Sequence, residues 1–361
     1  FGQFELNSFS SNIPTGFKTL SSANLPKPSI TLPNKHFDNL LWTGNGSSRS
    51  ITGLNFQPDL AWIKNRSNAY HHGLFDAVRG ANKVLKSSDT SAEGTFTQQL
   101  MSFNSDGYTL GDNSDSGNYV NINGHTYAAW NWNAGGSTVT NNDGDISSQV
   151  RANTTAGFSI VSYTGNGTNN TDVTIGHGLG VTPDVVIIKK RGSGGSEAQW
   201  GVLHKDLSSG HNIFLQTTSA ENTYSNQIKS RQSTTFTLNL ADASGGRYNR
   251  SGETYIAYCF SGITGYSKFG SYTGNGSSNG PFVHLGFRAS FIMLKNIDRS
   301  APWYIFDIKR NPVNEALKTF SANTSAAEAT DSNFLDILSN GFKVRNSGTF
   351  RNGNNETLIY L

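Results

Sequence analysis

Thr-Gly-Asn-Gly occurs three times in this chain of 361 residues, at Thr43–Gly46, Thr164–Gly167 and Thr273–Gly276. The second copy lies 121 residues after the first, the third 109 residues after the second, and an aromatic residue precedes each. A single hydrophobic core rarely grows past about 250 to 300 residues, so a chain of this length is expected to hold two or three domains. The repeated tetrapeptide indicates that these domains are copies of one another.

Three further elements recur around the tetrapeptide in the same order. An apolar run ends in lysine, a second short segment ends in Asp or His, and a closing segment begins with threonine. The runs are Leu60–Lys64, Val185–Lys189 and Phe291–Lys295; the second segments are Gly73–Asp76, Gly201–His204 and Tyr304–Asp307; the closing segments are Thr126–Trp130, Thr254–Tyr258 and Thr357–Tyr360. Four matched elements predict three tandem copies of one domain.

Each copy has the pattern of β structure. Short runs rich in Val, Ile, Phe, Tyr and Thr alternate with clusters of Gly, Asn, Asp and Ser, and no long stretch repeats every 3.6 residues. Asp106-Gly107 and Asn340-Gly341 separate apolar runs, and such dipeptides favour hairpins with type I′ turns. The sequence therefore predicts an all-β chain of three tandem, jelly-roll-like β-sandwich repeats with an extended N-terminal linker.

The expected boundaries follow from the repeats and from the composition between them. Residues 1–36 hold four of the nine prolines, and proline blocks sheet hydrogen bonds and favours extended chain, which predicts a linker or strap. Repeat one is expected at 37–136, repeat two at 156–264 and repeat three at 265–361. The Gly, Ser, Asn and Asp content of residues 137–155 predicts a flexible linker.

Composition and charge exclude several classes of protein. Charged residues are 15% of the chain, against roughly 25% in typical domains, and the net charge of +3 is spread without a run of one sign. This pattern argues against nucleic-acid binding and against a basic membrane-surface segment. No apolar stretch approaches the length of a membrane span. The single cysteine, Cys259, excludes an intrachain disulfide and a cysteine zinc cluster.

Several motifs resemble a repeat common in predicted structural and tail-fibre proteins of marine bacteriophages. They are Tyr163–Gly167, Gly176–Gly180 leading into Pro183-Asp184, Ser251–Phe260 and Gly265–Gly276. In that family the repeat often follows a lectin-like SPRY domain, and Phe1-Gly2-Gln3 is similar to the exit from one. The resemblance implies a virion-surface, extracellular fibre protein, a homotrimer by analogy, and other virion proteins as partners.

Positions filled alike in all three copies are most simply scaffold, because one catalytic site would not need three versions. The aromatic residues that precede Thr-Gly-Asn-Gly are therefore expected to pack in the core. Asp76 with Arg79 and Asp307 with Arg310 share one spacing, which suits either a paired-charge brace or a ligand clamp. Repeat two has His204 and Leu207 there. A localised function is expected where the copies differ.

The sequence gives little support for an enzyme, a metal site or a cofactor site. His71 and His72 would point to opposite faces of a strand, and Cys259 lies in an apolar segment that predicts a buried, inert thiol. No Gly-x-Ser-x-Gly elbow, Ser-His-Asp set or calcium loop with a bidentate glutamate is evident. We expect no catalytic residues, no metal and no cofactor.

Two classes of function stay open. In a receptor-binding fibre, exposed aromatic residues on loops would stack on host-surface sugars, and repetition would add avidity; the candidates are Tyr70, His72, Trp200 and Trp303. The last three share one aligned column, which favours a scaffold role for them. In the alternative, the repeats are a purely structural virion module, such as a capsid decoration, fibre shaft or cement.

Overall fold

The computed structural model describes residues 28–361 apart from positions 116, 118, 169–170, 193–197, 224–227 and 239–246. The protein is all-β, with 44% strand and about 2% helix. The two short helical segments are a 3₁₀ turn, η2 (Pro33–Lys35), and α1 (Thr349–Asn352). Most of the linker predicted at 1–36 lies outside the described residues.

Unit one contains β1 to β9 and forms two antiparallel layers. The larger sheet has the order β1-β9-β3-β4-β5-β6, and the smaller one has the order β2-β8-β7. The strands are β1 (Phe37–Thr43), β2 (Arg49–Thr52), β3 (Leu60–Asn65), β4 (Gly73–Asp76), β5 (Gly80–Leu85), β6 (Gly94–Thr95), β7 (Leu100–Asn104), β8 (Gly107–Leu110) and β9 (Thr126–Trp132).

Unit two repeats this plan with two strands added at one edge. Its larger sheet has the order β10-β11-β12-β20-β14-β15-β16-β17, and its smaller sheet has the order β13-β19-β18. The strands are β10 (Val139–Asn141), β11 (Ser148–Asn153), β12 (Phe158–Thr164), β13 (Val173–Gly176), β14 (Val185–Lys190), β15 (Gly201–His204), β16 (His211–Phe214), β17 (Asn222–Thr223), β18 (Ile228–Arg231), β19 (Thr235–Leu238) and β20 (Thr254–Phe260).

Unit three joins the two layers into one curved sheet of eight strands, with the order β21-β28-β23-β24-β25-β26-β27-β22. The long strand β26 pairs with β25 on one side and β27 on the other, so it carries the chain from one layer to the next. The strands are β21 (Gly270–Thr273), β22 (Phe282–His284), β23 (Phe291–Asn296), β24 (Tyr304–Asp307), β25 (Ala316–Ser321), β26 (Ala329–Leu338), β27 (Gly341–Val344) and β28 (Thr357–Tyr360).

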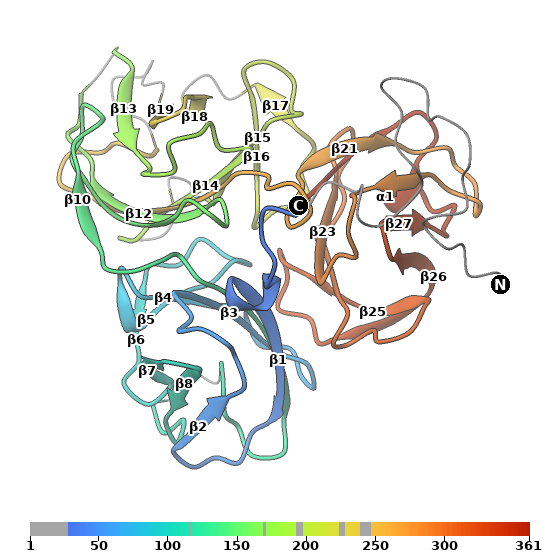
Figure 1. The fold of residues 1–361 in the computed structure, drawn as a ribbon, viewed down its shortest axis with the longest axis horizontal. Coiled ribbons are helices and arrows are strands. Elements are labelled where there is room, and N and C mark those ends of the chain that lie inside the picture. Colours follow the sequence, from blue (N-terminus) through green and yellow to red (C-terminus); the bar gives the residue numbers. More distant parts are fainter. Residues whose placement is uncertain are drawn as a thin grey trace, which may run out of the picture.

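The three units surround one shared core. In Figure 1 unit one lies at the bottom, unit two at the upper left and unit three at the right, and their larger sheets face the centre. Successive residues of a strand point to opposite faces, and in β3 Trp62 joins the shared core while Ile63 joins the core of unit one. In β14, Ile187 and Ile188 divide in the same way. The apolar runs are uninterrupted because both faces of each central strand are buried.

The all-β class expected from the sequence is confirmed, and the structure adds a core that the three units share. Each unit has a core of its own, but the shared core draws residues from all three. Residues 137–155, expected to be a flexible linker, carry β10 and β11, and β11 pairs with β12 along six residues. The composition there is typical of linkers because β10 is the edge strand of the sheet and β11 is next to it, where polar residues are tolerated.

The hairpins predicted at Asp106-Gly107 and Asn340-Gly341 are confirmed, but their turn type is not. Asn104 pairs with Gly107 and Leu338 with Gly341, so the turn residues lie one position earlier than expected. Neither Asp106 nor Asn340 has a positive φ, which a type I′ turn requires.

The Thr-Gly-Asn-Gly corner is built the same way in all three units. In unit one, a Cβ on Gly44 would lie 2.2 Å from the carbonyl oxygen of Ile122, and Gly46 has φ +66°. The buried Asn121 accepts a hydrogen bond from Asn45 N at 3.1 Å, and its carbonyl accepts one from Gly46 N at 2.9 Å. Asn249 and Asn352 hold the other two corners in the same way. The repeated tetrapeptide is therefore architecture, as expected.

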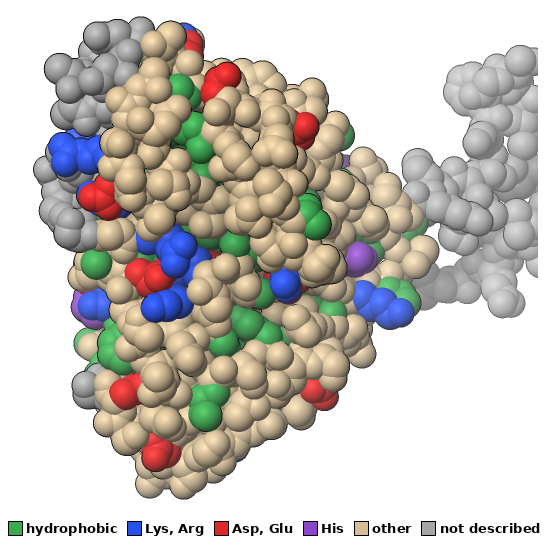
Figure 2. Space-filling view, turned by 90° about the vertical axis from the view of Figure 1, so that its left-hand side faces the viewer, with side chains coloured by type: hydrophobic (Ala, Val, Ile, Leu, Met, Phe, Trp, Pro, Cys, Tyr) green, Lys and Arg blue, Asp and Glu red, His purple; other side chains and the backbone are tan. Residues whose placement is uncertain are grey.

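The surface matches the low charge content. Figure 2 shows one face on which hydrophobic and charged side chains form small separate areas among backbone and other side chains. Among the described residues, no helix is long and apolar enough to cross a membrane.

Candidate functional site

Three of the four predicted site residues lie at the interfaces between units, fully buried. His72, Trp200 and Trp303 each show 0% exposure and directly precede β4, β15 and β24. The expectation that they are exposed on loops is wrong, because neighbouring units cover them, and a sugar can stack only on an accessible ring. Tyr70 is half-buried at the surface of unit one.

These three side chains make equivalent hydrogen bonds between units. Trp200 Nε1 of unit two donates to the carbonyl of Lys86 in unit one at 2.7 Å, and Trp303 Nε1 of unit three donates to the carbonyl of Phe214 in unit two at 3.1 Å. His72 Nε2 of unit one contacts the carbonyl of Ser321 in unit three at 3.2 Å. The three bonds link unit two to unit one, unit three to unit two, and unit one to unit three. Residues at one aligned position of the repeats therefore join each unit to a neighbour.

The tautomer of His72 follows from its partners. Trp62 Nε1 donates to His72 Nδ1 at 2.8 Å, so Nδ1 is the acceptor and Nε2 carries the proton that faces Ser321. Burial lowers the pKa of His72 well below its ordinary value. His72 is therefore a neutral hydrogen-bond donor that replaces tryptophan in this column.

The first charged interface joins unit one to unit two. Arg79 Nε lies 2.5 Å from Asp76 Oδ2, with both side chains 0% exposed, and Tyr258 of unit two donates its hydroxyl to the same carboxylate at 2.8 Å. Glu93 accepts hydrogen bonds from Arg79 at 3.1 Å and from Arg191 of unit two at 2.9 Å. The Asp-x-x-Arg spacing is thus a brace, and both of its charges are neutralised inside the protein.

The second charged interface repeats this network between units three and one. Arg310 Nε lies 2.5 Å from Asp307 Oδ2, and Trp130 Nε1 of unit one donates to that carboxylate at 3.1 Å. Glu328 pairs with Arg310 at 3.2 Å and with Arg66 of unit one at 2.9 Å. The two networks match group for group, with tryptophan in place of tyrosine.

The third interface, between units two and three, is neutral at these positions. His204 and Leu207 replace Asp and Arg, and Leu361 aligns with Trp130 and Tyr258. His204 Nε2 contacts the carbonyl of Tyr360 at 3.3 Å. Burial lowers the pKa of His204 to about 4, so the ring is neutral near pH 7. A backbone hydrogen bond replaces the charged network here.

One buried lysine per unit completes each interface. Lys64, Lys189 and Lys295 end the apolar runs and are 0% exposed. Lys189 Nζ donates to the carbonyl of Ser91 in unit one at 3.1 Å, and Lys295 Nζ donates to that of Thr218 in unit two at 3.0 Å. Burial lowers the pKa of Lys64 and of Lys295 to about 7 and that of Lys189 to about 8.

The two glutamates of the charged networks, Glu93 and Glu328, favour the ionised form. Burial disfavours the charged form of Glu93, but a hydrogen bond from Arg191 and the charge of Arg79 outweigh it and hold the pKa of Glu93 below its ordinary value. Arg66 and Arg310 lower the pKa of Glu328 in the same way. Each network therefore joins two units through a glutamate whose side chain is only 10% exposed.

The single cysteine is enclosed as well. Cys259 is buried, and burial raises the pKa of its thiol to about 12, so the thiolate is scarce near neutral pH. In the part of the chain that the structure describes, no group of three His, Cys, Asp or Glu side chains is placed to hold a metal ion.

One surface cluster is found in unit one alone. The ring of Tyr70 lies 6.0 Å from that of His125, and Asn68 Nδ2 lies 3.2 Å from His125 Nε2. Alanine stands at the position of Tyr70 in the other two units, and glutamate stands at the position of His125. This is the kind of position at which a localised function was expected.

Sequence reasoning found the Asp-x-x-Arg pairs but missed their partners. Glu93 and Glu328 lie in loops whose sequences do not align clearly between units. Each accepts a hydrogen bond from an arginine of another unit. The recurrent lysine at the end of the apolar runs was a signal, since a charged residue that closes a buried run needs a partner.

Comparison with known proteins gives one family. A family model described as a domain of unknown function (DUF7483) matches residues 32–361. No curated protein sequence and no solved structure matches the chain.

Proposed function

Because the chain belongs to the DUF7483 family and its repeated residues join three units into one body, we propose that it is a non-catalytic structural module of a bacteriophage virion surface. The module decorates the particle or forms part of a fibre, as the resemblance to tail-fibre repeats suggests. One observation supports this role above all: the recurrent polar side chains bond to neighbouring units instead of facing a cleft.

The pattern of buried polar groups supports a mechanical role. Asp76, Arg79, Asp307 and Arg310 have side chains with 0 to 1% exposure, and each carboxylate is paired with a guanidinium. Groups held in this way are unavailable to a substrate, whereas a catalytic acid or base must reach the reacting atoms. Buried pairs of this kind favour one arrangement over its alternatives, because removing one partner leaves an unpaired charge.

The proposal is tested on the particle itself. Mass spectrometry of purified virions of the phage that encodes this chain should detect it, and antibodies against the purified protein should label the particle surface in electron micrographs. Finding the chain only in the infected-cell fraction, never on particles, would overturn the virion role. Hydrolysis of host polysaccharide by the purified protein would overturn the non-catalytic part.

A second candidate function, binding of a host-surface glycan, rests on the Tyr70 cluster. An accessible aromatic ring beside histidine and asparagine offers a stacking face with polar neighbours, and neither of the other units repeats it. A glycan array is the direct test, with Tyr70→Ala expected to abolish a positive signal. Phe282→Ala, at an aromatic residue with 45% exposure elsewhere on the surface, is the matched control.

Self-association stays a prediction. Three units within one chain already form the threefold arrangement, so a homotrimer would hold nine units. Light scattering coupled to size exclusion measures this directly, at an expected mass of three chains.

A further inference from the structure

The Tyr70 cluster lies on a turn of unit one that has a counterpart in unit three. The unit-one turn follows β3, and the unit-three turn follows β23. In the unit-one turn, Asn65 Oδ1 accepts a hydrogen bond from Ser67 N at 2.9 Å. In the unit-three turn, Asn296 Oδ1 accepts one from Asp298 N at 3.0 Å. The two turns therefore share a local fold, and they differ in the side chains that they carry.

The unit-three turn is charged, whereas the unit-one turn is neutral. Glu356 accepts hydrogen bonds from Asn296 Nδ2 at 2.7 Å and from Arg299 Nε at 2.8 Å. Unit one keeps the asparagine and has a neutral polar side chain at each charged position. The aligned pairs are Ser67 with Asp298, Asn68 with Arg299, His125 with Glu356, and Tyr70 with Ala301. The unit-one turn therefore has three fewer charges and one more aromatic ring.

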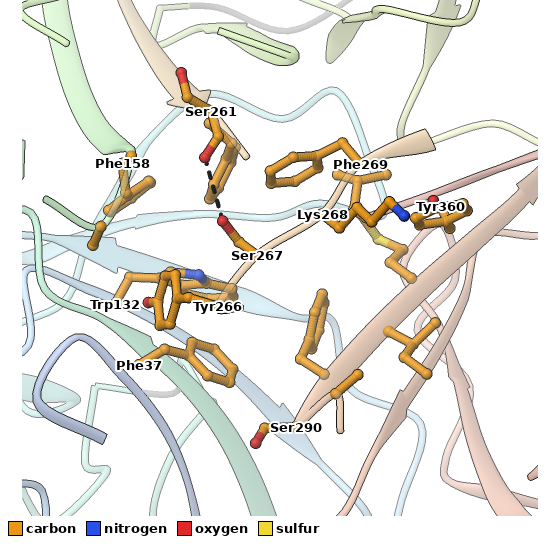
Figure 3. A pocket seen from close by; sticks show the side chains of 18 of the residues that line it. Phe37, Trp132, Phe158, Ser261, Tyr266, Ser267, Lys268, Phe269, Ser290 and Tyr360 are labelled. Atoms are coloured by element: carbon orange, nitrogen blue, oxygen red, sulfur yellow. Dashed lines mark hydrogen bonds between the residues drawn. The ribbon is translucent and has the colours of Figure 1, made fainter. Parts of the chain in front are cut away.

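The ring of Tyr70 is placed differently from the aromatic rings of the shared core. Figure 3 shows Phe37, Trp132 and Phe158 gathered in the interior, where the ring of Trp132 lies 4.9 Å from that of Phe37 and 6.2 Å from that of Phe158. Tyr70 is half-buried at the surface, beside the ring of His125. The C–H face of a pyranose can pack on such a ring while the sugar hydroxyls stay in water.

The hydrogen bonds of the unit-one turn determine which polar groups are left for a ligand. Asn65 Oδ1 accepts from backbone N–H groups, so Asn65 Nδ2 donates to His125 Nδ1 at 2.9 Å. His125 Nε2 therefore carries the proton and faces the amide of Asn68 at 3.2 Å. Asn68 accepts this proton through its oxygen, because a half-turn exchanges the two ends of an amide. The NH₂ of Asn68 and the hydroxyl of Tyr70 are then left to bond a ligand.

The charges next to this turn are already paired. Arg66 donates two hydrogen bonds to Glu328, from Nε at 3.0 Å and from Nη2 at 2.9 Å, and Lys64 is 0% exposed. An acidic sugar would lose water from its carboxylate here without gaining a countercharge, and an amino sugar would meet the same cost. A neutral sugar exchanges hydrogen bonds to water for hydrogen bonds to Asn68 and Tyr70, at little cost.

We propose that the unit-one turn binds an uncharged sugar, with a C–H face of the pyranose on Tyr70 and a ring hydroxyl accepting from Asn68. This assignment rests on the glycan-binding function proposed for the Tyr70 cluster and restricts it to neutral glycans. His125 is a positioning residue, since both of its nitrogens are engaged by the amides of Asn65 and Asn68.

The test is an array of oligosaccharides printed as matched pairs, in which the acidic member has a carboxylate in place of the C6 hydroxymethyl group. The pairs are glucose with glucuronate, galactose with galacturonate and mannose with mannuronate. The intact protein should bind a neutral member at least about tenfold more tightly than its acidic partner. Raising NaCl from about 50 to about 500 mM should leave that affinity unchanged, because no ion pair is formed.

Two outcomes of the array separate this assignment from the function on which it rests. Failure to bind any member overturns the glycan-binding function and this assignment together. Binding of an acidic member as tightly as its neutral partner, abolished by Tyr70→Ala, overturns the neutral class alone and leaves glycan binding in place.

A graft locates the site. Asn68→Arg combined with His125→Glu gives the unit-one turn the same asparagine, arginine and glutamate that the unit-three turn holds, so the variant should fold. It should weaken the neutral sugar by at least about tenfold. Asn68→Ala is the second variant if the graft does not fold, and should weaken the sugar about three- to tenfold through the lost hydrogen bond. Native affinity in either folded variant would overturn the proposal.

The control adds the same two charges elsewhere. Thr140 and Gln149 are exposed and face each other across β10 and β11, with Gln149 Nε2 donating to Thr140 Oγ1 at 3.0 Å. Thr140→Arg combined with Gln149→Glu should therefore leave the affinity for the neutral sugar unchanged. A loss equal to that of the graft would show that the added charges act without contact, and would overturn the assignment to the unit-one turn.

Discussion

Trp130 Nε1 donates a hydrogen bond of 3.1 Å to the buried carboxylate of Asp307, which lies 177 positions later in the chain. Tyr258 donates an equivalent bond of 2.8 Å to Asp76. Both donors lie on the closing strand of one unit, and both acceptors belong to the Asp-x-x-Arg brace of its neighbour. A residue on the last strand of each of these units therefore also joins that unit to its neighbour.

Asp307→Asn is expected to lower the free energy of unfolding by about 3 to 5 kcal/mol. The substitution leaves the Arg310 guanidinium buried without its nearest countercharge, because Glu328 is shared with Arg66. Urea unfolding followed by tryptophan fluorescence measures the change.

The control for this variant is Asp172→Asn. Asp172 pairs with Lys229, and the two side chains are 40% and 49% exposed. An exposed pair of this kind contributes about 0 to 1 kcal/mol. Equal losses in the two variants would show that the buried network has no special role.

Trp303→Phe is expected to cost about 1 to 3 kcal/mol beyond the loss of ring volume. The substitution removes the indole N–H and its bond to the carbonyl of Phe214 at a buried interface between two units. Trp200→Phe should behave in the same way, because its indole reaches the carbonyl of Lys86. Thermal unfolding by calorimetry gives the values.

Tyr70→Phe is the matched aromatic control, since it removes a hydroxyl at the surface of unit one. It should change stability by less than about 0.5 kcal/mol. A Trp303→Phe variant as stable as Tyr70→Phe would contradict the assignment of the indole bond as an attachment between units.

The repeat, the β class and the scaffold role of shared residues could be predicted from sequence because each depends on local patterns. The aromatic residues that precede Thr-Gly-Asn-Gly are buried as expected, with Trp42 8%, Tyr163 3% and Tyr272 9% exposed. The alignment of His72, Trp200 and Trp303 in one column also indicated scaffold, and their burial agrees with that interpretation.

The shared core could not be predicted from the same patterns, although a signal was present. Runs such as Leu60–Lys64 lack the alternation of a sandwich strand with one wet face, which indicates burial on both faces. Glu93 pairs with Arg191, which lies 98 positions away in the chain. This pairing depends on how the sheets of two units pack against each other, and no sequence spacing predicts it. The sequence around Trp200 did not show whether this tryptophan is buried in the core or exposed on a loop.

Stability is expected to rise between about pH 7 and 9. The pKa of Lys64 and of Lys295 falls from 10.5 to about 7 on folding, and that of Lys189 falls to about 8, because of burial. In this window the unfolded chain holds protons that the folded one has released, so raising the pH favours folding. Each lysine contributes up to about 1.4 kcal/mol per pH unit. Above pH 9 the buried Cys259 thiol, whose pKa rises to about 12, opposes the trend.

Lys295→Met separates this effect from other titrations. Burial is the cause of the lowered pKa of Lys295. Replacing this lysine should therefore reduce the slope of the unfolding free energy against pH by the contribution of one lysine, up to about 1.4 kcal/mol per pH unit. Urea titrations at four pH values between 7 and 9 give that slope. A native slope of zero across the window would rule out neutral lysines in the folded state.

Unit two expressed alone, as residues 137–264, is expected not to fold cooperatively. Excision exposes the face of β12, β14, β15 and β20 that carries Phe158, Ile187, Trp200 and Tyr258, all at most 4% exposed in the whole chain. Burial of each such side chain contributes about 1.5 to 3 kcal/mol, so the four together contribute as much as the whole stability of a typical domain. Binding of a hydrophobic dye and a broad thermal transition should mark the fragment, whereas the full chain should unfold sharply. A monomeric fragment with a sharp transition would mean that the units are independent domains and that the shared core is only a contact between them.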